Sequence, residues 1–101
     1  MFYKINSMMT LAGGSSNIVT LKVFDGVARQ TFIKARTNNS TAFSVHIDDD
    51  GGRQIMTYGI HKGELNDIQN HYPMEGENKL FITNVSATET FDVKWVVEEK
   101  K

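Results

Sequence analysis

Near its C-terminus, the sequence places an apolar side chain at every second position, at Phe91, Val93, Trp95 and Val97. Successive side chains of a β-strand point to opposite faces, so this period gives a strand with one apolar face and one polar face. An amphipathic helix would instead repeat its apolar residues every three or four positions. The alternation therefore predicts a strand over residues 91–97.

The same period recurs along the rest of the chain, between turns rich in Gly, Asn, Asp and Ser. The predicted strands are residues 17–24, 30–36, 43–47, 54–60 and 79–83. In 54–60, the apolar face would hold Met56, Tyr58 and Ile60. The least regular stretch predicts one short strand near residues 65–69, with a short helix as the alternative.

Six to eight short strands separated by turns predict an all-β protein. The expected architecture is a single antiparallel β-sandwich of the jelly-roll or immunoglobulin-like kind. Asp25-Gly26 separates two of the strands and is a common hairpin dipeptide, because glycine accepts the positive φ that such turns require. It predicts that residues 17–24 and 30–36 pair as a hairpin.

The length of 101 residues fits one domain spanning residues 1–101. Residues 1–12 would form an N-terminal arm or a strand, and residues 98–101 a solvated charged tail. Eleven basic and twelve acidic side chains leave a net charge of -1, so no strong field attracts phosphate backbones or anionic lipid. Nucleic acid and membranes are therefore not expected as partners.

Cysteine is absent, which excludes disulfides, thiolate catalysis and zinc ribbons. The first ten residues lack the apolar core of a signal peptide, and no later stretch approaches the roughly 18 apolar residues of a membrane-spanning helix. We therefore expect synthesis in the cytoplasm and a soluble product.

Three consecutive aspartates, Asp48, Asp49 and Asp50, precede two glycines. Calcium prefers several carboxylate and carbonyl oxygens, so a metal site is a minor hypothesis here. The spacing of an EF-hand is absent, however. We expect these residues to be solvated turn formers.

No other residue set predicts catalysis. The histidines His46, His61 and His71 have no cysteine nearby and no close spacing of the kind that metal ligands show. Glu75 and Glu77 form a pair of carboxylates, but they lie in the most polar loop, and no Gly-x-Ser-x-Gly motif occurs. No catalytic, cofactor-binding or metal site is predicted, and an enzyme is not expected.

Aromatic residues suggest one alternative function. Trp95, Tyr58, Tyr72 and Tyr3 could stack on sugar rings, as in a small carbohydrate-binding β-sandwich module whose partners are surface glycans. The position of Trp95 on an alternating strand instead predicts that its side chain lies in the core. The two interpretations differ in whether the aromatic faces are exposed.

Two segments echo each other: Thr37-Asn38-Asn39-Ser40 and Thr83-Asn84-Val85-Ser86 each precede an alternating apolar strand. This pattern of strand, Asn-x-Ser turn and strand resembles small bacteriophage virion proteins of about this length, and the resemblance covers residues 19–98. It implies a β-sandwich protein of the capsid decoration, fibre or tail accessory type, which works by protein-protein contact.

The expected function is therefore that of a non-enzymatic structural protein of a bacteriophage virion, made in the host cytoplasm. Its partners would be itself, as a homo-oligomer, and other virion proteins. The interface would use the apolar residues of the N-terminal segment, namely Phe2, Met8, Met9 and Leu11. A weaker third option is an inhibitor that binds one host enzyme.

Overall fold

The computed structural model describes residues 1–69 and 72–100. It contains seven strands, all paired antiparallel, and the described ranges hold no helix. The strands are β1 (Phe2–Leu11), β2 (Ser16–Ala35), β3 (Ala42–Asp48), β4 (Gln54–Lys62), β5 (Glu64–Asp67), β6 (Pro73–Asn84) and β7 (Glu89–Glu99). The predicted all-β class is confirmed.

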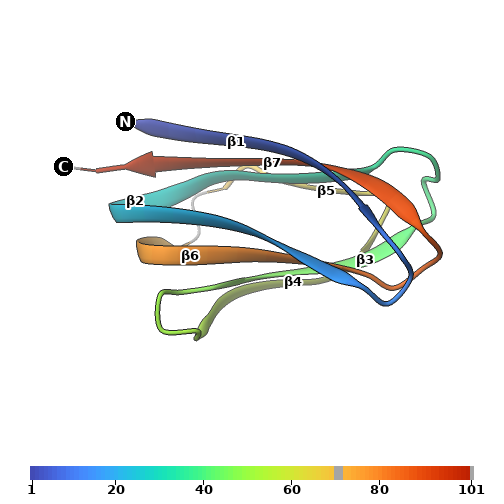
Figure 1. Cartoon of the computed structure of the whole chain (residues 1–101). Helices are drawn as coiled ribbons and strands as arrows, with labels where there is room; N and C mark the ends of the chain where they lie inside the picture. Colours follow the sequence, from blue (N-terminus) through green and yellow to red (C-terminus); the bar gives the residue numbers. More distant parts are fainter. Residues whose placement is uncertain (70–71, 101) are drawn as a thin grey trace.

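The seven strands form one hydrogen-bonded set that bends over into two layers (Figure 1). β2 produces the bend: at about 3.3 Å per residue, its 20 residues would extend about 66 Å. That length exceeds the longest dimension of the molecule, 41 Å. Residues Ser16–Val27 of β2 pair with β6, and Gly26–Ala35 pair with β7.

One layer therefore contains β1, β7, the second half of β2 and β5, and the other contains the first half of β2, β6, β3 and β4. The apolar faces of both layers point inward. The predicted alternation in β7 is confirmed, since the side chains of Phe91, Val93, Trp95 and Val97 are all buried. Phe43 of β3 packs edge-on against Phe91 across the core, with ring centroids 5.3 Å apart.

The predicted hairpin at Asp25-Gly26 is wrong. The chain does reverse direction there, but the two halves of β2 pair with different strands, so Asp25-Gly26 is a corner between the layers (Figure 1). Gly26 does not have the positive φ that the hairpin prediction assumed. It is needed for close approach instead, because a Cβ there would lie 2.9 Å from the carbonyl oxygen of Glu98.

The predicted inward face of β4 is correct only in part. Met56 and Tyr58 pack against the core, but Ile60 is 67% exposed. The register with β3 shifts between Val45 and His46, which leaves Tyr58 as an extra residue in a β-bulge followed by Gly59 at a φ of 68°. A bulge exchanges the two faces of the strand beyond it, so Ile60 points outward.

Close to both of its ends, the described chain lies in strands of the sandwich. Residues 1–12 contain the strand β1 rather than an arm. Residues 98 and 99 are not part of a solvated tail, because β7 continues through Glu99. Glu98 forms an ion pair with Arg29, and the buried Glu99 accepts hydrogen bonds from the Tyr3 hydroxyl at 2.9 Å and the Phe24 N–H at 2.7 Å. Lys101 lies outside the described residues.

The irregular middle of the chain contains the short strand β5, not a helix. Leu65 of β5 is buried, and Ile68 just beyond its end is exposed. β5 pairs with β2 from Thr31 to Lys34, so it widens the layer that contains β7.

Candidate functional site

Two of the three consecutive aspartates accept hydrogen bonds from backbone N–H groups, Asp49 within its own turn and Asp50 from β6. Asp49 Oδ1 accepts hydrogen bonds from the N–H groups of Gly51 at 3.0 Å and Arg53 at 2.8 Å, and Asp50 Oδ1 accepts one from the N–H of Glu77 at 3.0 Å. Within residues 1–69 and 72–100, no group of three or more His, Asp or Glu side chains could hold a metal ion. Asp49 therefore acts as a turn former, and Asp50 connects the turn to β6.

The histidines are not brought together. The ring of His46 stacks on Phe81, with centroids 4.5 Å apart, on the outer face of its layer. His61 lies on the inner face, beside Phe43, with centroids 6.4 Å apart. His71 lies outside the described residues.

The aromatic side chains that suggested sugar binding are mostly inside the protein. Trp95 is 0% exposed, which confirms its predicted place in the core, and Tyr72 is buried. The Tyr58 hydroxyl lies 3.2 Å from Thr31 Oγ1, and burial raises the pKa of Tyr58 well above its usual value. Tyr3 is half-buried, and its hydroxyl donates a hydrogen bond to Glu99. The proposed stacking platform is therefore not present on the surface.

The four apolar residues predicted to form an interface are divided between the two faces of β1. Phe2 and Met8 are 61% and 62% exposed, whereas Met9 and Leu11 are 8% and 5% exposed and belong to the core. The reason is the period of the strand: odd-numbered residues of β1 point inward and even-numbered residues point outward. Met9 and Leu11 are therefore part of the core, and Phe2 and Met8 are the exposed members of the predicted interface.

β1 lies at the border of its layer and pairs with β7 alone. Beyond the start of the strand, Met1 and Glu99 exchange two hydrogen bonds, at 2.7 Å and 3.2 Å. In an antiparallel pair, such hydrogen-bonded positions alternate with positions whose N–H and C=O groups point away from the partner. The odd-numbered residues of β1 therefore bond to β7, and the even-numbered ones face away from it.

Thr10 and Thr90 support this assignment. They face each other across β1 and β7, and their hydroxyl oxygens are 2.8 Å apart. Side chains come closest at the positions that are not hydrogen-bonded through the backbone, as expected for an even-numbered residue of β1. The residues with outward backbone groups form the free edge of β1: Phe2, Lys4, Asn6, Met8 and Thr10.

The other edges in the described structure are protected or short. The first half of β2 is also a border strand, but the side-chain oxygen Oδ1 of Asn17 caps the N–H of Ile18 at 2.8 Å. β4 is interrupted by its bulge, and β5 has only four residues. β1 instead pairs over ten consecutive residues without a register shift. Long, regular and uncapped edges are the ones that accept another strand.

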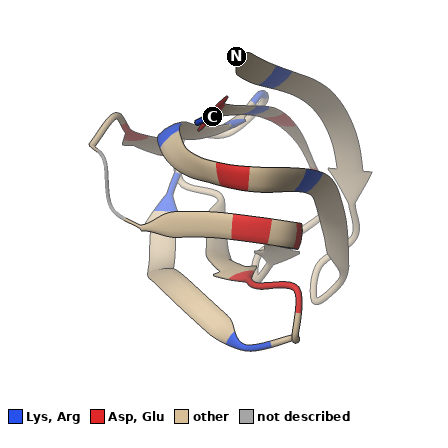
Figure 2. Cartoon of the chain, turned by 90° about the vertical axis from the view of Figure 1, so that its left-hand side faces the viewer, with Lys and Arg blue, Asp and Glu red and all other residues tan. Residues whose placement is uncertain are grey.

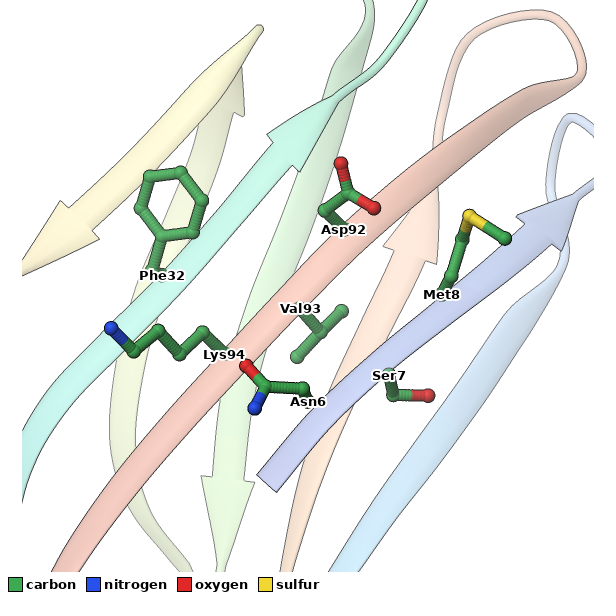
Figure 3. Close-up of a pocket in the computed structure, with 7 residues that line it drawn as sticks. All are labelled: Asn6, Ser7, Met8, Phe32, Asp92, Val93 and Lys94. Carbon is green, nitrogen blue, oxygen red and sulfur yellow. The ribbon is translucent and has the colours of Figure 1, made fainter. Parts of the chain in front are cut away.

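A shallow surface hollow of about 410 Å³ lies beside this edge, on the outer face of the layer (Figure 3). The side chains of Asn6 and Met8 border it from β1, those of Asp92 and Lys94 from β7, and that of Phe32 from β2. Arg36, which follows β2, links two of these strands. Its Nη1 lies 2.8 Å from Met8 Sδ, and its Nε lies 3.3 Å from Asp92 Oδ2.

Figure 2 views the end of the sandwich where both termini lie. It shows basic and acidic residues interspersed, without a large region of one sign. The described residues include no helix that could cross a membrane.

The sequence matches no model of a protein family and no curated protein, but the fold matches solved structures. The mitogen derived from Yersinia pseudotuberculosis has a TM-score of 0.62 and 16% identity, covering 100% of this chain and 91% of that chain. Bacillus endospore appendages, described as disulfide-linked pili, have a TM-score of 0.61 and 13% identity, with 95% and 85% covered.

A third structure is the core of Drosophila NLP, described in terms of pentamer formation and histone binding. It has a TM-score of 0.55 and 12% identity, and the match covers 98% of this chain and 99% of that chain. At these identities the likeness shows the fold alone. This chain therefore shares a β-sandwich fold with these structures.

Sequence reasoning identified the N-terminal segment but did not identify its free edge. The missed signal is the alternation in residues 2–11, where the exposed positions Phe2, Lys4, Asn6, Met8 and Thr10 share one parity. That pattern is typical of a strand with one face on a core. It does not say that the strand lies at the border of the sheet.

Proposed function

We propose that this chain is a non-enzymatic structural protein of a bacteriophage virion that acts by self-association through the free edge of β1. The observation that carries the proposal is the edge itself. Five residues of β1 point their backbone N–H and C=O groups away from β7, and no other described strand pairs on that side. Such groups form a template for a strand from another chain.

The side chains of the edge favour contact rather than protection. Natural edge strands avoid pairing by using charges, proline or bulges. The free edge of β1 contains one charged residue, Lys4, and has no proline and no bulge. Phe2 and Met8 add exposed apolar surface at two positions along the edge.

The non-enzymatic part of the proposal is supported by the way the polar side chains are used. Asp49 accepts hydrogen bonds from N–H groups of its own turn, Asp50 accepts one from the N–H of Glu77 in β6, and Glu89 accepts hydrogen bonds from Thr37, Thr41 and Thr90. These groups stabilise turns and strand ends. Turnover of a substrate that is lost on replacing His46 or Asp48 would overturn this part.

The virion setting is supported by the resemblance of the two segments of strand, Asn-x-Ser turn and strand to those of small phage proteins. Within that setting the chain would be a capsid decoration or tail accessory protein, made in the host cytoplasm and bound to other virion proteins. An antibody against this chain, applied to purified particles from the infected host, tests this part. A chain that is found in the lysate but absent from the particles would overturn it.

Self-association is tested with a proline placed on the free edge. The N–H of Asn6 faces away from β7, so Asn6→Pro removes a donor from the edge without removing a bond between β1 and β7. The matched control is Thr20→Pro, at the free side of the first half of β2. Light scattering gives the native mass of each protein, and circular dichroism checks its fold.

We expect the unmodified chain and Thr20→Pro to be oligomeric and Asn6→Pro to be monomeric. A monomeric unmodified chain at the highest soluble concentration would overturn the proposal, as would an Asn6→Pro variant with unchanged mass. If Asn6→Pro fails to fold, Met8→Lys adds a charge to the same edge and should lower the mass in the same way. An unchanged mass for a folded Met8→Lys variant would contradict the proposal.

A further inference from the structure

We infer that β1 pairs with β1 of a second copy about a two-fold axis, in the register that places Ile5 opposite Ile5. This inference rests on the proposed self-association and adds the partner strand and the register. The symmetry follows from closure: two identical edges that meet antiparallel satisfy each other, and a two-fold dimer leaves no further β1 edge free. Since the axis is perpendicular to the sheet, the inner faces of both copies lie on the same side.

Hydrogen bonding limits the possible registers. Only even-numbered residues of β1 have free backbone groups, so each of them must face an even-numbered residue of the second copy. Registers that obey this condition differ by steps of two residues. With at least three facing pairs, the axis then passes through Lys4, Ile5, Asn6, Ser7 or Met8, and these five registers differ in which side chains become neighbours.

The register centred on Ile5 matches the side chains best. It places Phe2 opposite Met8 of the second copy, and it does so twice because of the symmetry. Both residues are large, apolar and exposed, and a methionine sulfur makes favourable contacts with an aromatic ring. Lys4 then faces Asn6, which gives the ammonium group an amide oxygen as a partner.

The other registers are less favourable. With the axis at Lys4, two ammonium groups face each other directly, which is destabilising. At Asn6, the charged Lys4 faces Met8, and Phe2 faces the polar Thr10. At Ser7 or Met8, Phe2 has no opposite residue in β1 and loses its contact. None of these four registers covers Phe2 and Met8 together.

The inner face gives an independent reason for the axis at Ile5. The side chain of Ile5 packs against the core but is only half-buried, because β1 is the last strand of its layer (Figure 1). In the proposed register the two Ile5 residues are opposite each other at a position without backbone hydrogen bonds, where side chains approach most closely. Each copy therefore covers the open side of the core of the other.

The absence of cysteine in this chain makes a direct test possible. Opposed residues at such a position have Cα atoms about 4.5 Å apart, which lies within the range of about 4.4–6.8 Å that a disulfide spans. The test variant is Ile5→Cys. The matched control is Ser7→Cys, which is on the same strand, on the same face and similarly half-buried. In the proposed register, Ser7 faces Tyr3 and not itself.

We expect mild oxidation to convert most of the Ile5→Cys variant to a covalent dimer on a non-reducing gel, and to leave Ser7→Cys mostly monomeric. A Val85→Cys variant measures cross-linking by random collision, because Val85 is exposed in a loop between β6 and β7. Cross-linking of Ser7→Cys in preference to Ile5→Cys would place the axis at Ser7 and overturn the inference.

The reduced proteins separate this inference from the proposed function. If light scattering shows an oligomer but oxidation does not link Ile5→Cys, self-association holds and the register is wrong. If the chain is a monomer, both the proposed self-association and the inferred register are wrong. Should Ile5→Cys fail to fold, a mixture of Tyr3→Cys and Ser7→Cys chains should form a mixed disulfide, since these positions face each other in the same register. The absence of that mixed disulfide in an oligomer would also contradict the inference.

Discussion

Asn38 and Asn84 occupy equivalent turns: each accepts a hydrogen bond, through its side-chain oxygen, from the N–H of the serine two residues later, and the distance is 2.9 Å in both. The similarity between the two sequence segments therefore corresponds to the same asparagine-to-serine hydrogen bond in each turn. The surroundings differ. Asn38 is exposed, whereas Asn84 is buried and also donates to the carbonyl oxygens of Leu11 and Ala87, both at 2.8 Å.

We therefore predict different costs for the same substitution at the two turns. Asn84→Ala leaves two carbonyl oxygens without this donor in a buried place, so it should lower the free energy of unfolding by about 2–4 kcal/mol. Asn38→Ala removes one exposed bond and should cost less than about 1 kcal/mol. Urea unfolding of both variants measures the difference. Equal costs would show that burial does not distinguish the two turns.

Glu89 predicts a dependence of stability on pH. Burial alone would raise the pKa of this carboxyl group, but hydrogen bonds from Thr37, Thr90 and Thr41 outweigh burial and lower the pKa below 4.5. A lowered pKa in the folded state means that the ionised group stabilises the fold above about pH 4.5. That stabilisation is lost as the pH falls through the folded-state pKa.

Glu89→Gln should consequently lower the free energy of unfolding by about 1–3 kcal/mol at neutral pH. The loss should become smaller below the folded-state pKa, where the native carboxyl group is protonated as well. Glu75→Gln is the control, because Glu75 is exposed. Thermal unfolding at neutral and acidic pH measures both variants. A loss that does not depend on pH would show that the charge of Glu89 is unimportant.

Gly26 lies at the corner of β2, and we predict that replacing it even with alanine lowers the stability of the protein. A Cβ there would lie 2.9 Å from the carbonyl oxygen of Glu98, a backbone atom that cannot move without disturbing β7. Gly26→Ala should cost about 1–3 kcal/mol of stability. At Gly51 the nearest atom is 3.6 Å away and φ is not positive, so Gly51→Ala should be close to neutral. If Gly26→Ala and Gly51→Ala lowered the stability equally, the backbone at the corner would be able to accommodate a Cβ without strain.

The bulge in β4 predicts that two isoleucines contribute very differently. Ile47→Ala creates a cavity under β3, where the side chain is fully buried, and should cost about 2–5 kcal/mol. Ile60→Ala removes exposed atoms and should change the free energy of unfolding by less than about 0.5 kcal/mol. A large loss from Ile60→Ala in urea unfolding would mean that the strand does not switch faces at Gly59.

The sequence predicted the strands well where the signal is local. Alternating burial depends on neighbouring residues, so the strand of Phe91, Val93, Trp95 and Val97 and its buried face could be recognised directly. Pairing is not local. Asp25-Gly26 predicted a hairpin because the sequence does not state that β6 and β7 are the partners of the two halves of β2.

The bulge in β4 and the free edge of β1 were also not predicted, because they too depend on how the strands pair. At Gly59, one extra residue changes the face of Ile60, and nothing in the sequence marks that residue as extra. The candidate site was recognised as an apolar N-terminal segment, but of its four predicted residues only Phe2 and Met8 are exposed. Which strand forms the border of a sheet depends on the order of all the strands, which the sequence alone did not predict.

Amide hydrogen exchange tests most directly whether the free edge of β1 joins two copies. The N–H groups of Lys4, Asn6 and Met8 should be protected at high protein concentration and should exchange rapidly after dilution. Those of Ile5 and Ser7, which bond to β7, should be protected at both concentrations and serve as the internal reference. Rapid exchange of Lys4, Asn6 and Met8 at every concentration, with Ile5 and Ser7 still protected, would contradict self-association through β1.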